Sequence, residues 1–188
     1  SQLARLRERQ IPLVIAVDKV AASGGYMMAC LANELIAAPF AILGSVGVIG
    51  ALPNFNELLK QHRIRYEEHT AGEHKRSLTL FGENTDADRQ QFRHELAVTH
   101  ALFKTHIRRY RPQLDIDAIA TGETWYGAQA VENHLIDAIG TSDDYILAHL
   151  HSHQLVQLEE HVPERWLDKI KHRFLGKIQA RPLKARIR

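Results

Sequence analysis

An α/β domain is the fold class that this sequence predicts, and three observations lead to it. The chain has 188 residues, of which 45% are hydrophobic and 24% charged, a balance typical of one ordinary folded domain. Short β-branched stretches alternate with helix-forming stretches along its length, which favours an α/β arrangement. The sequence contains no internal repeat and no low-complexity segment, so it indicates neither a repeat protein nor a disordered one.

The first expected elements form a strand-helix-strand unit. Residues 11–17 are a β-branched run bounded by charge, which is consistent with a buried parallel strand. The helix is expected where Met, Ala and Leu are frequent, and the strand after it is stopped by Pro39. In order, we expect a charged helix over 1–10, a strand over 11–17, a turn of small residues over 21–25, a helix over 26–33, a strand over 34–38, and a glycine-rich strand or loop over 43–50.

A long helix is expected in the middle of the chain. Thr85 followed by Asp88 resembles a capped helix start, and the carboxylates of Asp86 and Asp88 complement the dipole there. Apolar residues then recur at spacings of three and four until Pro112 ends the pattern, which indicates a scaffold helix with one apolar face. The other expected elements are helices over 55–62, 117–120, 128–134 and 143–149, and strands over 65–69 and 155–158.

Charge and cysteine content exclude several kinds of protein. The formal net charge is only +2, whereas nucleic-acid-binding proteins usually carry a strong basic excess on one surface. Cys30 is the only cysteine, so neither an intramolecular disulfide nor a CxxC metal site can form. No run approaches the roughly 20 apolar residues that cross a bilayer, so we expect the chain as given to be soluble.

Residues 161–188 form a separate basic region. They contain nine Lys and Arg against two acidic residues, and their apolar residues at helical spacing favour a helix on an anionic membrane or a partner. A solvated or packed basic helix is the alternative. We therefore expect a catalytic core over 1–160 and a basic tail over 161–188. Because Ser1 leads directly into a charged helix, we also expect an upstream region in the complete protein.

Ser23 is the candidate nucleophile. It lies between an expected strand and an expected helix, where a side chain can be exposed while amides at the helix start stabilise negative charge. On the local pattern alone, a serine before two glycines is more often a turn or N-cap residue. The G-x-S-x-G elbow of lipases is not met, because Ala21 stands in place of its first glycine.

Several blocks of the chain resemble one family. Residues 17–26, VDKVAASGGY, closely resemble the nucleophile segment of the bacterial signal peptide peptidases, and most closely that of their SohB-type members. The further matching blocks are Ala38-Pro39, GSVGV at 44–48, TAGEHKRSLT at 70–79 and GETWYG at 122–127. Ordered blocks at family spacing, covering roughly residues 1–150, are more specific than any single motif.

The resemblance implies a Ser-Lys dyad. In the family, the block that corresponds to residues 72–75 carries the general base, so Lys75 receives that role and Ser23 is the nucleophile. The base must be a neutral amine, so its site must favour the uncharged form. The N–H of Gly24 is the expected oxyanion donor, and the family's second donor comes from an upstream glycine-rich segment that does not occur in these 188 residues.

Gly44, Ser45, Val46 and Gly47 are the expected substrate-binding residues. They resemble the family segment beside the substrate groove, whose exposed backbone suits an extended peptide added as a strand. A glycine-rich buried strand is the alternative for the same residues. The resemblance also makes Ser45 a candidate third polar residue that assists Lys75.

The resemblance further implies a crotonase-like or Clp-protease-like fold of repeated strand-helix units. The implied function is a serine endopeptidase that hydrolyses apolar peptides, such as signal-peptide remnants at the bacterial inner membrane, where an N-terminal helix tethers family members. The implied partners are a peptide substrate, further copies in a homo-oligomer and the membrane, but not nucleic acid. No metal or organic cofactor is implied. We expect the given residues alone to fold and associate but to hydrolyse peptides poorly, because the second oxyanion donor is missing.

Two other functions stay open at this point. A crotonase-fold acyl-thioester enzyme would use similar oxyanion geometry without a serine nucleophile. A non-catalytic assembly module could keep the same blocks, and a buried lysine paired with a carboxylate would favour it. The alternating His149, His151 and His153 could ligate zinc in an extended segment, but they lie where a helix is expected to end, and solvated histidines are the simpler interpretation.

Overall fold

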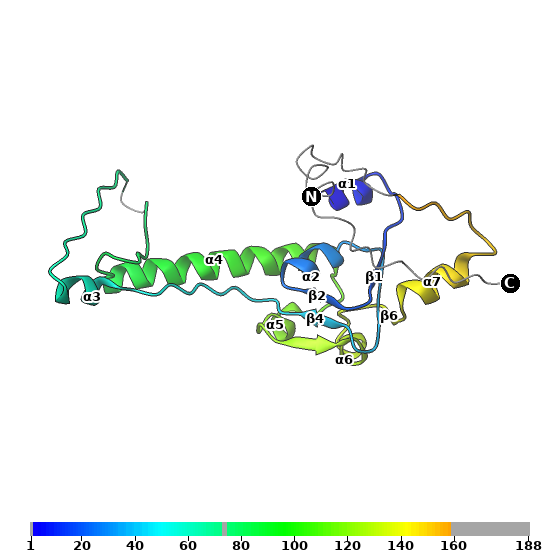
Figure 1. Ribbon diagram of the computed structural model, residues 1–188. Coiled ribbons are helices and arrows are strands. Elements are labelled where there is room, and N and C mark those ends of the chain that lie inside the picture. The colour runs from blue at the N-terminus through cyan, green and yellow to red at the C-terminus, as the bar shows by residue number, and fades with distance from the viewer. Residues whose placement is uncertain (1, 73–74, 159–188) are drawn as a thin grey trace, which may run out of the picture. The chain divides into compact units, whose positions relative to one another are not determined.

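The computed structural model describes residues 2–72 and 75–158 (Figure 1). Residues 1–149 form one compact unit and residues 150–188 a second. The expected basic tail over 161–188 lies outside the described residues, so the division into core and tail stays a prediction. Within the described part of the chain, no helix is both long and apolar enough to cross a bilayer.

The fold is mixed α/β, which confirms the predicted fold class. Helices and strands alternate along most of the chain. Their order is α1 (Gln2–Glu8), β1 (Val14–Val17), β2 (Val20–Ala22), α2 (Gly24–Ala29), β3 (Glu34–Ala37), β4 (Ile42–Gly44), α3 (Asn56–Gln61), α4 (Asp86–Tyr110), α5 (Ile116–Ile119), β5 (Thr124–Tyr126), α6 (Gly127–Glu132), β6 (Ala138–Ile139) and α7 (Ser142–His149).

Two small sheets organise the core. The first has the order β1-β3-β6 with parallel pairing throughout, so Ile15 lies opposite Leu35 and Ile36 opposite Ala138. The second has the order β2-β4-β5, in which β2 and β4 are parallel and β4 and β5 antiparallel. Since β1 and β2 are almost continuous in sequence, one stretch of chain contributes to both sheets and ends at Ser23.

A single apolar cluster packs α2 between the sheets and the C-terminal half of α4. Tyr26 of α2, Leu35 of β3 and Leu43 of β4 are completely buried in it, together with Ile107 of α4. The Tyr26 hydroxyl donates to the carbonyl oxygen of Leu135 at 2.7 Å, so its polar end is satisfied inside the core. Helix α2 is therefore held firmly, and so is the residue that precedes it.

An ion pair between buried Arg111 and the more exposed Asp137 joins the end of α4 to the first sheet. Arg111, whose side chain is 3% exposed, donates to the Asp137 carboxylate at 2.8 Å and to the carbonyl of His134 at 3.1 Å. The amide of Leu35 also donates to Asp137, at 2.7 Å. Burial opposes ionisation of Asp137, but these hydrogen bonds outweigh it and lower the pKa of Asp137.

The expected helices are present, with ends that differ by a few residues, whereas several strands are not as expected. The long helix begins at the predicted Thr85 capping box and ends before Pro112. Residues 65–69 and 155–158 were expected to be strands and are irregular. Part of the expected turn over 21–25 belongs to β2, and the short strands β5 and β6 were not predicted.

The N-terminal half of α4 packs against extended chain rather than against the core. Beyond β4, residues 45–55 have no regular secondary structure and run beside α4 (Figure 1). Gly50 lies against the ring of Phe92 and near Leu96, where an added Cβ would clash. The only buried residues of α4 among those described are Phe103 and Ile107, so the helix is embedded near one end alone.

Candidate active site

Ser23 stands at the turn from β2 into α2 with an unusual backbone. Its φ of 51° and ψ of −117° fall where glycine is favoured and other residues are strained. Its amide donates to the carbonyl of Gly44 at 2.8 Å, and its own carbonyl accepts from the amide of Met27 at 2.9 Å. The residue is exposed, and its hydroxyl does not cap α2. The fold thus holds the Ser23 backbone firmly and leaves the hydroxyl available for chemistry.

Gly24 begins α2 directly after Ser23. Its N–H belongs to the first turn, where amides have no partner within the helix. Gly24 is exposed, and a Cβ added to it would meet nothing within 4 Å. The space beside it is therefore open enough for a substrate carbonyl to approach, as an oxyanion donor requires.

The structure places the expected substrate segment next to Ser23. Gly44 ends β4, and its carbonyl accepts the Ser23 amide. The φ of Gly44 is 94°, and the ring of Trp125 occupies the place of a side chain, with Cε3 2.6 Å from an added Cβ. Ser45 follows with a φ of 52° and donates its amide to the carbonyl of Glu123 at 2.6 Å. Glycine at position 44 is therefore explained by its backbone conformation and by the Trp125 ring. Substrate binding by this segment stays a prediction.

Val46 and Gly47 complete the segment. Val46 is fully buried in the core cluster, so its side chain takes part in core packing, and substrate binding by its backbone stays a prediction. Gly47 donates its amide to the carbonyl of Ser45 at 3.0 Å, and an added Cβ would lie 3.0 Å from Cα of Gly122. Close packing thus accounts for both glycines of the segment.

Lys75 lies elsewhere in the same unit. It is exposed, and its amide donates to the carbonyl of Gly72 at 3.2 Å. Two residues later, the Ser77 hydroxyl donates to Glu95 of α4 at 3.0 Å.

Ser23 and Lys75 are associated with different parts of α4. Helix α2, which follows Ser23, meets α4 where His106 Nε2 donates to the carbonyl of Met27 at 2.9 Å. Glu95 and His106 are 11 positions apart, which is roughly 16 Å along a helix. No contact among the described residues joins Lys75 to Ser23. The structure therefore does not assemble the dyad within one chain, and the dyad stays a prediction.

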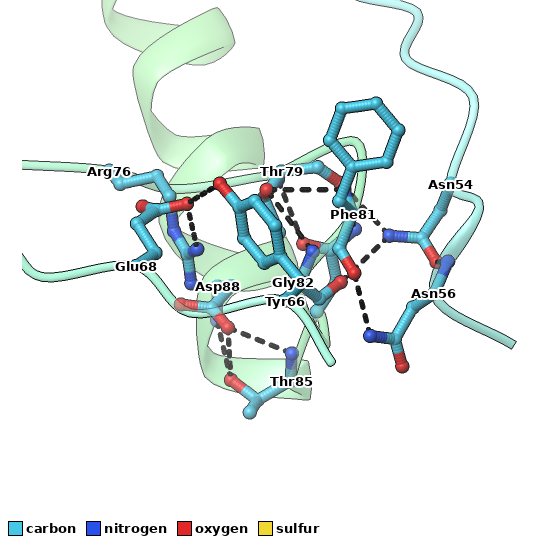
Figure 2. A network of polar contacts seen from close by, with 11 residues as sticks. Asn54, Asn56, Tyr66, Glu68, Arg76, Thr79, Phe81, Gly82, Thr85 and Asp88 are labelled. Atoms are coloured by element: carbon cyan, nitrogen blue, oxygen red, sulfur yellow. Dashed lines mark hydrogen bonds and ion pairs between the residues drawn. The ribbon is translucent and has the colours of Figure 1, made fainter. Parts of the chain in front are cut away.

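The segment that carries Lys75 is held by a polar network that the sequence did not predict (Figure 2). Thr79, only 7% exposed, is its centre. The Thr79 amide donates to Asn84 Oδ1 at 2.9 Å, and its carbonyl accepts from the side-chain amides of Asn54 at 2.9 Å and Asn84 at 3.1 Å. Asn56 donates to the carbonyl of Phe81 at 2.7 Å. Only the frequency of asparagine around 54–56 and 84 could have hinted at it, and asparagine is common in ordinary turns.

Comparison with known proteins identifies relatives. The pattern of Peptidase family S49 matches residues 5–159. A probable protease SohB from Buchnera aphidicola subsp. Acyrthosiphon pisum is 49% identical over 176 residues, which are 92% of this chain and 52% of that protein. A probable protease SohB from Haemophilus influenzae is 49% identical over 169 residues, 90% of this chain and 48% of that protein. The chain spans about half the length of these curated relatives.

Among solved structures, a membrane-bound stomatin-specific protease in complex with a substrate peptide is similar at 14% identity and a TM-score of 0.44, over 77% of this chain and 55% of the other. A likeness of this degree carries no argument about function. The sequence matches are far stronger, and they include the segments of both Ser23 and Lys75. They confirm the family resemblance predicted from the sequence blocks, and the chain belongs to peptidase family S49.

Proposed function

We propose that the chain provides the nucleophile and the general base of a serine endopeptidase. Its substrates are apolar peptides, such as signal-peptide remnants at the bacterial inner membrane. The observation that carries the proposal is Ser23, an exposed serine in a glycine-type conformation at a helix start in a member of family S49. A residue needed only for the turn would be glycine at this φ, and a residue needed only as an N-cap would bond the helix amides.

The proposed reaction has two steps that pass through an acyl-enzyme. Uncharged Lys75 accepts the hydroxyl proton as Ser23 Oγ attacks the peptide carbonyl, and it passes that proton to the departing amine. Lys75 then accepts a proton from water as the water oxygen attacks the ester carbonyl, and it passes that proton to Ser23 Oγ as the ester bond breaks, which releases the carboxylic acid and restores both residues. In both steps the N–H of Gly24 stabilises the negative oxygen.

The base is supplied by a second copy of the chain in this proposal. Proton transfer requires Ser23 Oγ and Lys75 Nζ to meet, and their different places along α4 keep them apart within one chain. Both residues are exposed, so each is accessible to a neighbouring copy. Activity should therefore depend on a homo-oligomer.

The exposed Lys75 also bears on the rival functions. A buried Lys75 paired with a carboxylate would favour a non-catalytic assembly module. Lys75 is exposed, so this support for the module is missing. An acyl-thioester enzyme of crotonase type would have no need for a serine in a strained conformation at this turn.

The test uses the full-length protein and a fluorophosphonate probe, which phosphonylates activated serines with loss of fluoride. We expect the probe to label Ser23, and the variants Ser23→Ala and Lys75→Ala to be inactive toward an apolar fluorogenic peptide. A folded wild-type protein that the probe does not label would contradict the proposal.

Mixing the two inactive variants tests where the dyad forms. If the dyad lies between copies, unfolding and refolding them together restores part of the activity, because some sites combine an intact Ser23 with an intact Lys75. If wild-type protein refolded in the same way is fully active and the mixed variants recover no activity, both residues of the dyad lie in one chain.

A further inference from the structure

The residue after Lys75 belongs to a compact charged cluster (Figure 2). Arg76 Nη1 lies 2.9 Å from Glu68 Oε2, and the hydroxyl of Tyr66 donates to the same oxygen at 2.6 Å. The hydrogen bond from Tyr66, and then that from Arg76, lower the pKa of Glu68, although partial burial opposes them. Glu68 is therefore charged at neutral pH, and the ion pair with Arg76 is present where the enzyme would work.

The same guanidinium reaches the start of α4. The charge of Arg76 adds to the hydrogen bonds from Thr85 in lowering the pKa of Asp88, the capping-box residue of α4. Its Nη1 also lies 3.2 Å from a Cβ added at Gly82. Arg76 thus pairs with Glu68, lies close to the turn at Gly82, and acts through its charge on the beginning of α4.

This cluster lies on one side of Lys75 and leaves its side chain exposed. After Arg76, the chain is attached to α4 by Ser77 and to the network around Thr79. The backbone of Lys75 is therefore one residue away from a segment with several attachments. Such an arrangement can hold the Cα of Lys75 in a defined position while its long side chain extends outward.

We infer that Glu68 and Arg76 are positioning residues for Lys75. The ion pair between Glu68 and Arg76 fixes the backbone from which the Lys75 side chain reaches a serine. The inference rests on the proposed function of Lys75. The side chains of Arg76 and Glu68 are 31% and 25% exposed, and ion pairs near the surface contribute little to stability. Loss of this pair should therefore spare folding, yet a small displacement of a reacting group can cost about 10²-fold in rate.

The experiment measures kcat, KM and the melting temperature of Glu68→Gln, Arg76→Gln and Arg76→Lys in the full-length protein. Arg89→Gln is the matched control, because it removes another exposed ion pair at the same end of α4, that with Asp86 at 3.0 Å. We expect both Gln variants at 68 and 76 to lose at least about tenfold in kcat, with KM and melting temperature as in the control. Arg76→Lys, which can keep the ion pair, should retain most of the wild-type kcat. The double Gln variant should be no worse than either single one, because both remove the same interaction.

Two outcomes would overturn the inference. One is kcat values in the Gln variants equal to that of Arg89→Gln. The other is a loss of kcat in proportion to a loss in melting temperature, or an equal loss of kcat in Arg76→Lys. A merely structural role would produce either result. Lys75→Ala separates this inference from the proposed function. If Lys75→Ala stays active, both fail, whereas an inactive Lys75→Ala with active Gln variants leaves the proposed function standing alone.

Discussion

Ser23 and Lys75 are held in different ways, and each suits a different chemical role. The backbone of Ser23 is bonded at its amide by Gly44 and at its carbonyl by Met27. Among the described residues, the backbone of Lys75 bonds to Gly72, and its side chain is exposed. In the proposed function, the nucleophile benefits from a defined position, whereas a base on a long side chain can be delivered to it from another copy.

Replacing Lys75 by Arg should abolish peptide hydrolysis although the positive charge is kept. A guanidinium cannot be deprotonated in a protein, so it cannot accept the serine proton. General bases contribute about 10²–10⁴-fold in rate, and a loss of that size in kcat is expected. Lys60→Arg is the matched control, because Lys60 is also exposed and pairs with Glu57 at 2.9 Å. Near-normal kcat in a folded Lys75→Arg protein would show that another group is the base.

Replacing Gly44 by Ala should destabilise the turn that presents Ser23. The new Cβ would meet the Trp125 ring in a backbone conformation that L-residues rarely adopt, at a cost of about 1–3 kcal/mol for the backbone alone. Gly25→Ala is the control, since its Cβ would make an ordinary contact with Ala21 at 3.8 Å. Urea unfolding measures the difference, and equal stability of the two variants would contradict the role given to Gly44.

At the scale of elements, α4 was the most predictable and the short strands the least. The capping box and the three-to-four spacing are local signals, and both are present in the structure. Strands β5 and β6 have three and two residues, too few for alternation to show. Residues 65–69 are irregular because no strand in the described part of the chain pairs with them, and their side chains make local contacts instead, from Tyr66 to Glu68 and from Glu68 to Arg76.

The candidate site was predictable to the extent that it depends on neighbours in sequence. Ser23 is exposed at a strand-to-helix turn because the residues next to it form β2 and α2. The place of Lys75 depends on which part of a 25-residue helix its segment contacts. That contact comes from long-range packing, which no local pattern encodes.

Removing the cap of α4 should destabilise the helix end near Lys75. Thr85→Ala loses the bond from the Asp88 amide to the Thr85 hydroxyl and the bond from that hydroxyl to the Asp88 carboxylate, at a cost of about 1 kcal/mol. Thr105→Ala is the control, because its hydroxyl bonds only the carbonyl of Ala101 within the helix. Denaturant unfolding should show a loss for Thr85→Ala alone, and equal values would contradict the capping role.

At the scale of the whole molecule, the pair of Arg111 and Asp137 connects parts that are distant in sequence. It joins the end of α4 to Leu35 of β3 and to the residues before β6. Arg111 is almost completely buried, so its charge depends on Asp137. The unit over 1–149 should therefore lose stability as a whole when this pair is broken.

Asp137→Asn should lower the stability of the fold and change its dependence on pH. Breaking a fully buried ion pair costs about 3–5 kcal/mol, and the loss here should be smaller, because Asp137 is partly exposed and Arg111 keeps its bond to the carbonyl of His134. Because the pKa of Asp137 is lowered in the folded state, its contribution is present above the unfolded value of about 3.9 and is lost as pH falls through the folded pKa. Urea unfolding from pH 7 down to pH 2 should show a difference between wild type and variant that narrows below about pH 4. A constant difference over that range would contradict the linkage.

The strained backbone of Ser23 sets stability against activity. Glycine would adopt its φ of 51° without strain, so Ser23→Gly should be more stable than wild type by about 1 kcal/mol. Ser23→Ala should gain nothing, because a Cβ keeps the strain. Thermal unfolding of the two variants tests this, and equal melting temperatures would show that the conformation is not strained. A laboratory selection for heat resistance alone would thus tend to replace the proposed nucleophile, whereas a selection that also requires peptide hydrolysis should retain serine.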